Sequence, residues 1–189
     1  MISQTVSKKF SEYPIIAAVR TPEDFEAAFQ SKVKVLFMVG GDVFKAEEEL
    51  KRAAKAGYVV FLHMDLIEGI GRDASGLRFA KKEFGIQGIQ STKTHMLKIA
   101  KSEELCTVHR LFVTDFQSLK SGMTLVKNSN PDFVELTPGI LPKVIWKVKR
   151  EQARPIIASG LIATANEVKS LTAAGASNLV CSTHALWNL

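Results

Sequence analysis

Short runs of β-branched and other apolar residues alternate with amphipathic stretches along the whole chain of 189 residues. Successive runs are about 19 to 29 residues apart, roughly the length of one strand and the helix that follows it. This alternation is typical of parallel strands joined by crossover helices, so the sequence predicts an α/β protein. The predicted strands are centred near Ile15, Val35, Val59, Gly88, Thr107, Val134, Ile156 and Leu179.

The individual segments carry the signals expected of such units. Residues 35–39 and 59–62 are apolar without alternation, as in strands that are covered on both faces. The intervening stretches place apolar residues on one face of a helix, for example at Val168 and Leu171. Thr21, which is followed by a proline and then by an aspartate at the third position, is typical of a capped helix start. Thr164, followed three residues later by a glutamate, is another.

Eight β/α units without a linker predict a single domain, a compact (β/α)8 TIM-type barrel that spans residues 1–189. The length leaves no room for a second domain. A flavodoxin-like doubly wound sheet is the alternative, because periodicity alone does not distinguish a closed parallel sheet from an open one.

Cysteine content and hydropathy indicate the cellular compartment. Cys106 and Cys181 lie in apolar runs and form neither a disulfide framework nor a metal-binding pattern, so we expect reduced core residues. The first twenty residues carry scattered charges and lack the apolar stretch of a secretory signal, and no segment reaches about 18 uninterrupted apolar residues. These features predict a soluble cytoplasmic protein without membrane association.

Polar residues at the carboxyl ends of barrel strands share one mouth, and this rule selects the candidate site. Carboxylates beside a histidine there could perform acid-base catalysis, hold a divalent cation or bind ligand hydroxyls. The alternative is that His63 and Asp65 brace the barrel rim through hydrogen bonds. We assign no catalytic or metal-binding residue on this basis. The mouth candidates are His63, Asp65, Glu68, Lys93, Arg110, Asp115, Glu135 and Gly139.

The last two units carry the sharpest local signal, a predicted phosphate site. The seventh strand ends in Ser159, Gly160 and Leu161, and the eighth runs into Ser182 and Thr183 at a helix start. Many barrels bind phosphate between these two strands, where a glycine permits close approach and helix amides add positive partial charge. The alternative is that Gly160 only turns the chain and that the two hydroxyls only cap the last helix.

A basic helix is the candidate contact for a polyanion. Lys143, Lys147 and Arg150 recur at four- and three-residue spacing, and the whole chain has a formal net charge of +6. An ordinary solvated helix face would also explain them. The sequence contains no RNP-like aromatic motif or zinc knuckle, so any RNA would be bound through phosphates and shape.

From about Ile15 to Trp187 the sequence resembles the glycerol-uptake operon antiterminator regulatory proteins. Six motifs carry this resemblance through their order and spacing. They are HMDLIEGIGRD, GIQSTKTHMLKIAK, VHRLFVTD, PDFVELTPGI, PIIASGLI and GASNLVCSTHALW. The resemblance implies a protein that binds leader mRNA of glycerol-utilisation genes and prevents transcription termination when glycerol 3-phosphate is present. It implies this effector and no cofactor. The chain departs from the family pattern at Lys93, His109, Ser159 and His184.

Three functions are compatible with these features. The favoured one is the ligand-gated RNA-binding regulator. An enzyme acting on a sugar or polyol phosphate at the mouth is the alternative, because fold alone does not distinguish the two. A barrel that keeps the ligand site but regulates through a protein partner is the third, and a homo-oligomer is compatible with each.

Overall fold

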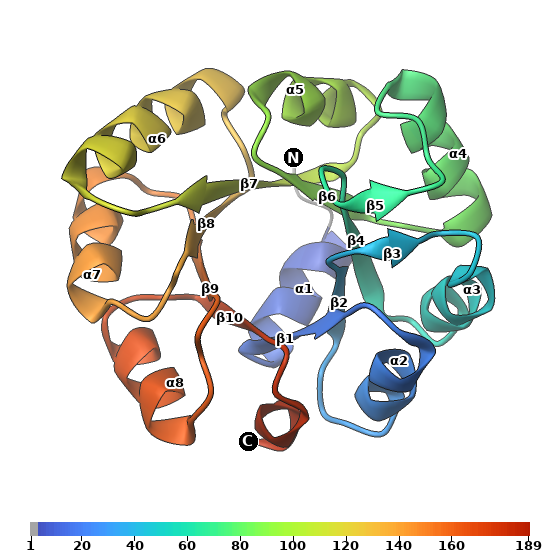
Figure 1. Ribbon diagram of the computed structural model, residues 1–189, viewed down its shortest axis with the longest axis horizontal. Coiled ribbons are helices and arrows are strands. Elements are labelled where there is room, and N and C mark those ends of the chain that lie inside the picture. Colours follow the sequence, from blue (N-terminus) through green and yellow to red (C-terminus); the bar gives the residue numbers. More distant parts are fainter. Residues whose placement is uncertain (1–3) are drawn as a thin grey trace.

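Eight parallel strands close into a barrel in the computed structural model, which describes residues 4–189 (Figure 1). The order around the barrel is β1-β10-β9-β8-β7-β6-β4-β2. All eight predicted strand positions lie in these strands, so the TIM-type barrel is confirmed and the open doubly wound sheet is excluded. The strands are β1 (Ile15–Val19), β2 (Val35–Met38), β4 (Val59–His63), β6 (Gly88–Ser91), β7 (Cys106–Phe112), β8 (Phe133–Thr137), β9 (Ile156–Ser159) and β10 (Asn178–Cys181).

Helices form a ring outside the strands (Figure 1). Capping boxes at Thr21 and Thr164 confirm the predicted helix starts, because each hydroxyl accepts a backbone N–H and the acidic residue three positions later caps in return. The ring consists of α2 (Pro22–Phe29), α3 (Glu47–Lys55), α4 (Ala74–Phe84), α5 (Thr94–Ser102), α6 (Phe116–Ser129), α7 (Pro142–Glu151) and α8 (Ala165–Ala173).

Three features were not predicted from the sequence. Two short strands, β3 (Gly41–Asp42) and β5 (Ile67–Glu68), pair with each other outside the barrel. An additional helix, α1 (Gln4–Glu12), precedes the first strand. The helix expected after Thr183 is a short 3-10 helix, η1 (His184–Asn188), and Thr183 makes no side-chain capping hydrogen bond to it.

The barrel contains two hydrophobic cores. One lies between the strands and the outer helices, and the other fills the inside of the barrel. Helix α1 lies across the amino-terminal end of the barrel, where Val6 and Phe10 join the inner core (Figure 1). The Phe10 ring stacks on Phe133 at a centroid distance of 4.3 Å and meets Phe61 edge-on at 5.7 Å. This end is therefore closed, which leaves the opposite end for a ligand.

Both cysteines are free and buried, as expected. Burial raises the pKa of the Cys181 thiol to about 12, so this thiol is protonated at neutral pH and unreactive. Within residues 4–189, no helix is both long and apolar enough to span a membrane.

Candidate ligand site at the barrel mouth

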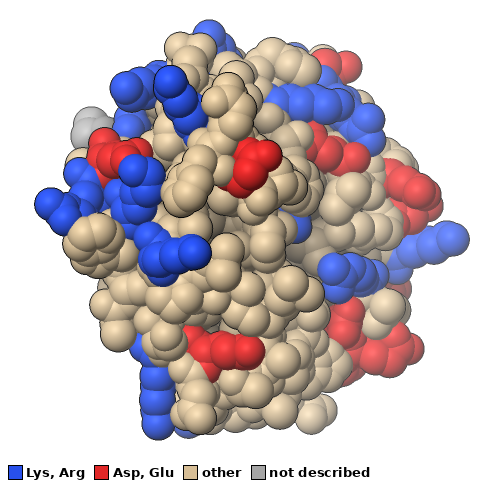
Figure 2. Space-filling model, turned by 60° about the vertical axis from the view of Figure 1, so that its left-hand side comes forward, with Lys and Arg blue, Asp and Glu red and all other residues tan. Residues whose placement is uncertain are grey.

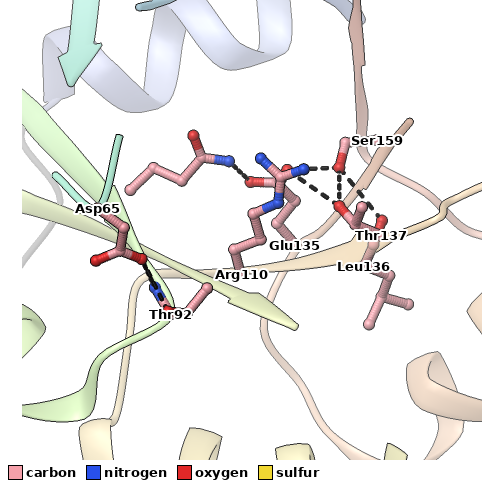
Figure 3. Close-up of polar contacts among 8 residues, drawn as sticks. Asp65, Thr92, Arg110, Glu135, Leu136, Thr137 and Ser159 are labelled. Atoms are coloured by element: carbon pink, nitrogen blue, oxygen red, sulfur yellow. Dashed lines mark hydrogen bonds and ion pairs between the residues drawn. The ribbon is translucent and has the colours of Figure 1, made fainter. Parts of the chain in front are cut away.

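Glu135 is the centre of a buried polar network at the mouth (Figure 3). It lies on β8 with its side chain inside the barrel and is fully buried. Its carboxylate accepts hydrogen bonds from Gln90 of β6 and from Ser159 of β9, and Arg110 Nε of β7 lies 3.7 Å from Oε1. Four neighbouring strands therefore contribute side chains to one cluster.

The environment of Glu135 favours its protonated form. Burial raises the pKa of this carboxyl, and the opposing effects of Arg110, Ser159, Gln90 and Thr137 do not fully offset it. A buried carboxyl poised in this way can donate or accept a hydrogen bond. It is therefore suited to binding a polar ligand and is also chemically able to act as an acid.

Three other buried atoms near this network have unmet hydrogen-bonding capacity. His63 Nδ1, Gln90 Oε1 and Arg110 Nε make no hydrogen bond in the structure. Burial and the charge of Arg110 lower the pKa of His63 to about 4, so this imidazole is neutral at physiological pH. Buried polar atoms are normally hydrogen-bonded. A cluster of buried polar atoms without partners is therefore a candidate position for a polar ligand.

Next to this network is a cavity of about 90 Å³ at the mouth. Arg20, Arg110 and Ser182 contribute polar groups to its wall, and Gly160 and Leu161 contribute part of the β9 end. The two guanidinium-bearing residues favour an anion, because arginine is suited to bidentate recognition of phosphate or carboxylate. Of the predicted phosphate residues, Ser159, Gly160, Leu161 and Ser182 line this cavity, whereas Thr183 is not among the lining residues.

Two glycines shape this side of the mouth. Gly160 has a φ of +79° and the next residue, Leu161, a φ of +62°, so the chain turns sharply after β9. At Gly139 a Cβ atom would lie 2.4 Å from the Ser159 backbone nitrogen, so only glycine permits this approach of the β8 and β9 ends. Gly139 N–H donates to the Ser159 carbonyl, which fixes the two loops together.

Asp65 braces the barrel rim. Its carboxylate accepts hydrogen bonds from Ser91 Oγ at 2.8 Å, from the Thr92 backbone N–H at 2.7 Å and from Thr92 Oγ1 at 2.8 Å (Figure 3). Burial acts to raise the pKa of Asp65, but these hydrogen bonds outweigh it and the pKa is lowered. The bracing interpretation is therefore supported for Asp65, while that for His63 is not, since His63 Nδ1 is unpaired.

The structure does not bring the remaining mouth candidates into the cavity. Asp115 caps helix α6 through the Ser118 N–H at 2.7 Å and is exposed. Glu68 lies on the outlying strand β5, and Lys93 lies at the start of α5, both exposed. Among residues 4–189, no group of three or more His, Cys, Asp or Glu side chains is arranged to hold a metal ion.

Sequence reasoning missed Arg20 as a site residue, and it placed Gln90 at the end of a strand without assigning it to the site. Arg20 directly follows β1 and lines the cavity, so a search for polar residues at strand ends could have found it. It is, however, a single charged residue with no recognisable motif around it. Gln90 stands near the end of β6, yet only the closed barrel shows that it shares the inner face with Glu135.

Three departures from the family pattern have clear structural roles. Ser159 hydrogen-bonds to Glu135 and Thr137. His109 is fully buried, with its ring nitrogens near Ser129 Oγ and the Thr92 carbonyl. His184 contacts Asp24 at 2.9 Å and thereby ties η1 to the start of α2.

Lys143, Lys147 and Arg150 all lie on α7 and are exposed, as the helical spacing predicted. Lys147 pairs with Glu151 at 2.9 Å. The Arg150 guanidinium lies 4.5 Å from the centre of the exposed Trp146 ring. The predicted basic face therefore also contains an aromatic side chain.

Known proteins resemble this chain over nearly its whole length. The crystal structure of a glycerol uptake operon antiterminator regulatory protein from Listeria monocytogenes is 31% identical, with a TM-score of 0.87, and 94% of this chain aligns with 96% of that one. A glycerol uptake operon antiterminator-related protein from Thermotoga maritima is 28% identical, with a TM-score of 0.80, over 92% of this chain and 96% of that one.

A further relative, the uncharacterized protein YgcP of Escherichia coli, is 32% identical over 93% of this chain and 92% of its own length. Orotidine 5'-phosphate decarboxylase from Pyrococcus horikoshii is 16% identical, with a TM-score of 0.65, over 88% of each chain, and this likeness shows the barrel fold alone. The family described as glycerol-3-phosphate responsive antiterminator matches residues 15–187. With this match and these relatives, the chain belongs to the glycerol-3-phosphate responsive antiterminator family.

Proposed function

We propose that this protein is an intracellular regulator that binds glycerol 3-phosphate at the barrel mouth. In the presence of this effector it binds leader mRNA of glycerol-utilisation genes and prevents transcription termination. The family match over residues 15–187 supports the regulatory role. The observation that carries the ligand assignment is the mouth cavity, whose wall combines Arg20 and Arg110 with Gly160 and Ser182.

The two halves of the ligand fit two parts of the mouth. A phosphate carries two negative charges at most, which the two arginines can neutralise, and the turn at Gly160 has no side chain to obstruct it. The hydroxyl groups of a polyol can both donate and accept hydrogen bonds, and Arg110, whose Nε lacks a partner, lines the cavity together with the hydroxyl-bearing Ser159 and Ser182. A small phosphorylated polyol therefore satisfies both sets of groups.

A calorimetric titration with glycerol 3-phosphate, repeated in the presence of a terminator-bearing leader RNA, tests this function. We expect saturable binding at one site per chain, and each ligand should tighten the binding of the other by the same factor, because linkage is reciprocal. Glycerol and inorganic phosphate serve as controls and should each bind more weakly. Independent binding of effector and RNA would contradict the regulatory mechanism.

A second candidate, an enzyme acting on a sugar or polyol phosphate, is favoured by one observation. Glu135 is a buried carboxyl with a raised pKa, next to Arg110 and open to the cavity. The test is prolonged incubation of glycerol 3-phosphate with the protein and magnesium, followed by NMR. The regulator returns the compound unchanged. A new product that disappears in the Glu135→Gln variant would establish the enzyme.

A further inference from the structure

Helices α6 and α7 are neighbours on the outside of the barrel (Figure 1). A groove lies between them, lined by residues of both helices. Helices α5 and α6 pack directly against each other, whereas α6 and α7 make few contacts. Two adjoining cavities lie between these helices, with volumes of about 170 Å³ and 470 Å³. Phe116 and Leu119 line both of them. The groove therefore runs from the loops at the mouth down along the two helices.

Large aromatic side chains are exposed on the two helices that form this groove. Phe116, the first residue of α6, lines both cavities and is 72% exposed. Trp146, in the middle of α7, precedes the groove residue Lys147 in the chain and is 55% exposed, but it is not among the residues that line the cavities. Leu141, which precedes α7, is also exposed and lines the mouth end of the groove. Exposing an indole or a phenyl ring to water is unfavourable, and several large apolar side chains exposed on neighbouring elements are typical of a binding surface.

The groove is also basic. Its two cavities are lined by Lys120, Lys127, Lys143 and Lys147, and the acidic side chains among the lining residues are Asp115 and Glu151. Glu151 pairs with Lys147, and the four lysines of the lining outnumber the two acidic side chains, so the groove has a positive balance of charge. Figure 2, in which this side of the molecule comes forward, shows lysine and arginine side chains gathered on its left-hand part.

We propose that this groove and the adjoining outer face of α7 bind single-stranded RNA, with bases stacked on Phe116 and Trp146 and phosphates contacting the lysines. The proposal rests on the regulatory function proposed above and specifies its RNA surface. Single strands are bound through exposed aromatic rings beside basic grooves, because every base has a face that can stack. A paired duplex hides its base faces, so the two rings would contribute nothing to duplex binding.

The groove is connected to the ligand site through the chain. Helix α6 follows β7, which carries Arg110, and α7 follows β8, which carries Glu135. The Arg110 guanidinium lies 5.3 Å from the centre of the Phe112 ring, and the next residue, Val113, lines the mouth end of the groove. A ligand that draws Arg110 into the cavity would remove this interaction one residue away from the groove wall.

Tryptophan fluorescence gives a direct test, because the chain has two tryptophans and only one of them is exposed among the described residues. Trp146 is exposed and Trp187 is 1% exposed. The probes are a short oligouridylate, its duplex with oligoadenylate and a terminator-bearing leader RNA, each with and without glycerol 3-phosphate. We expect the single strand and the leader RNA to quench fluorescence of the wild type, and the Trp146→Phe variant to lose this quenching while Trp187 still reports a folded chain.

Affinity measurements with matched variants complete the test. Trp146→Ala should weaken single-strand binding by roughly 5- to 100-fold, the equivalent of removing one base stack, while Trp146→Phe retains most of it. Replacing both Lys120 and Lys127 with alanine should reduce the salt slope by about 0.7 for each phosphate that is no longer neutralised. Lys55 and Lys82, exposed on the far helices α3 and α4, form the control pair, and their replacement should change neither quantity.

Three outcomes would overturn the proposal, and they are distinguishable. If the wild type binds leader RNA but the groove variants bind it equally well and Trp146 is not quenched, the RNA surface lies elsewhere and the regulatory function stands. If no RNA binds with or without glycerol 3-phosphate, the regulatory function itself fails. Duplex binding that equals single-strand binding and depends on the same lysines but not on Trp146 would also refute the stacking.

Discussion

Arg110 contacts both the buried polar network and the cavity at the barrel mouth. It lines the cavity, lies 3.7 Å from the buried Glu135 carboxyl and places its guanidinium over Phe112. Its Nε atom nevertheless has no hydrogen-bond partner. A guanidinium with an unpaired N–H in the cavity wall has capacity for an anion, and the phosphate of the proposed effector would supply one.

At the same scale, Gly160 tests where the anion binds. We expect Gly160→Asp to abolish binding of glycerol 3-phosphate and of sulfate, because the aspartate adds bulk and like charge to the cavity wall. Gly160→Ala is the matched control, since both variants strain a backbone with φ of +79° but only one adds charge. Calorimetry after a check of the thermal transition provides the measurement. Normal affinity in a folded Gly160→Asp protein would place the anion elsewhere.

His63 gives a prediction for stability against pH. Its pKa is 6.5 in the unfolded chain and about 4 in the fold, so its contribution to stability is complete above pH 6.5 and is lost as the pH falls towards 4. When the pH is lowered from 7 to 5, we expect the free energy of unfolding to fall by about 1–2 kcal/mol more in the wild type than in the His63→Gln variant.

Urea unfolding at both pH values, for the wild type and the His63→Gln variant, measures this difference. The comparison is made between variants because other groups titrate as well. His109 has a lowered pKa and acts in the same direction, whereas the raised pKa of Glu135 acts in the opposite one. An identical pH response in both proteins would mean that His63 titrates normally.

At the scale of elements, α1 closes the amino-terminal end of the barrel. Phe10 is 6% exposed and stacks on Phe133 of β8, so a side chain from outside the strands completes the inner core. We expect Phe10→Ala to lower the free energy of unfolding by about 3–5 kcal/mol, as for other buried phenylalanines. Lys8→Ala, on the exposed side of the same helix, should change it by less than about 0.5 kcal/mol. Equal effects would show that α1 does not close the core.

Helix α7 carries the second prediction at this scale. Replacing Lys143, Lys147 and Arg150 together by alanine should weaken RNA binding across sequences and flatten its salt dependence by roughly 0.7 to 0.9 for each phosphate that these side chains neutralise. All three side chains are exposed, so the fold and the thermal transition should persist. Fluorescence anisotropy titrations at several salt concentrations measure the slope. An unchanged affinity and slope would exclude this helix from the RNA surface.

For the whole molecule, the barrel separates two kinds of site. The mouth is concave, buried and lined by arginines, and the groove between α6 and α7 is open, basic and aromatic. Both are built on β7 and β8 and the helices that follow them. The proposed effector and the proposed RNA would therefore occupy separate surfaces, which is the arrangement that coupling between two ligands requires.

Local signals predicted most of the fold and part of the site. The strand positions, the caps at Thr21 and Thr164 and the exposed face of α7 follow from periodicity and from pairs of residues a few positions apart. The phosphate candidates at the ends of β9 and β10 line the cavity, apart from Thr183. Glu68, Lys93 and Asp115 also stand after predicted strands, but position in a loop does not fix the direction of a side chain.

The sequence by itself determined that this chain forms parallel β/α units and that polar residues gather at the strand ends, because spacing and capping are properties of neighbouring residues. The tertiary structure decided which of them meet. Gln90, Arg110, Glu135 and Ser159 come from four separate strands, and only the closed order of the barrel places them in one buried network. Closure likewise decided that α1 fills one end, since a cavity between eight strands exists only once all eight are paired.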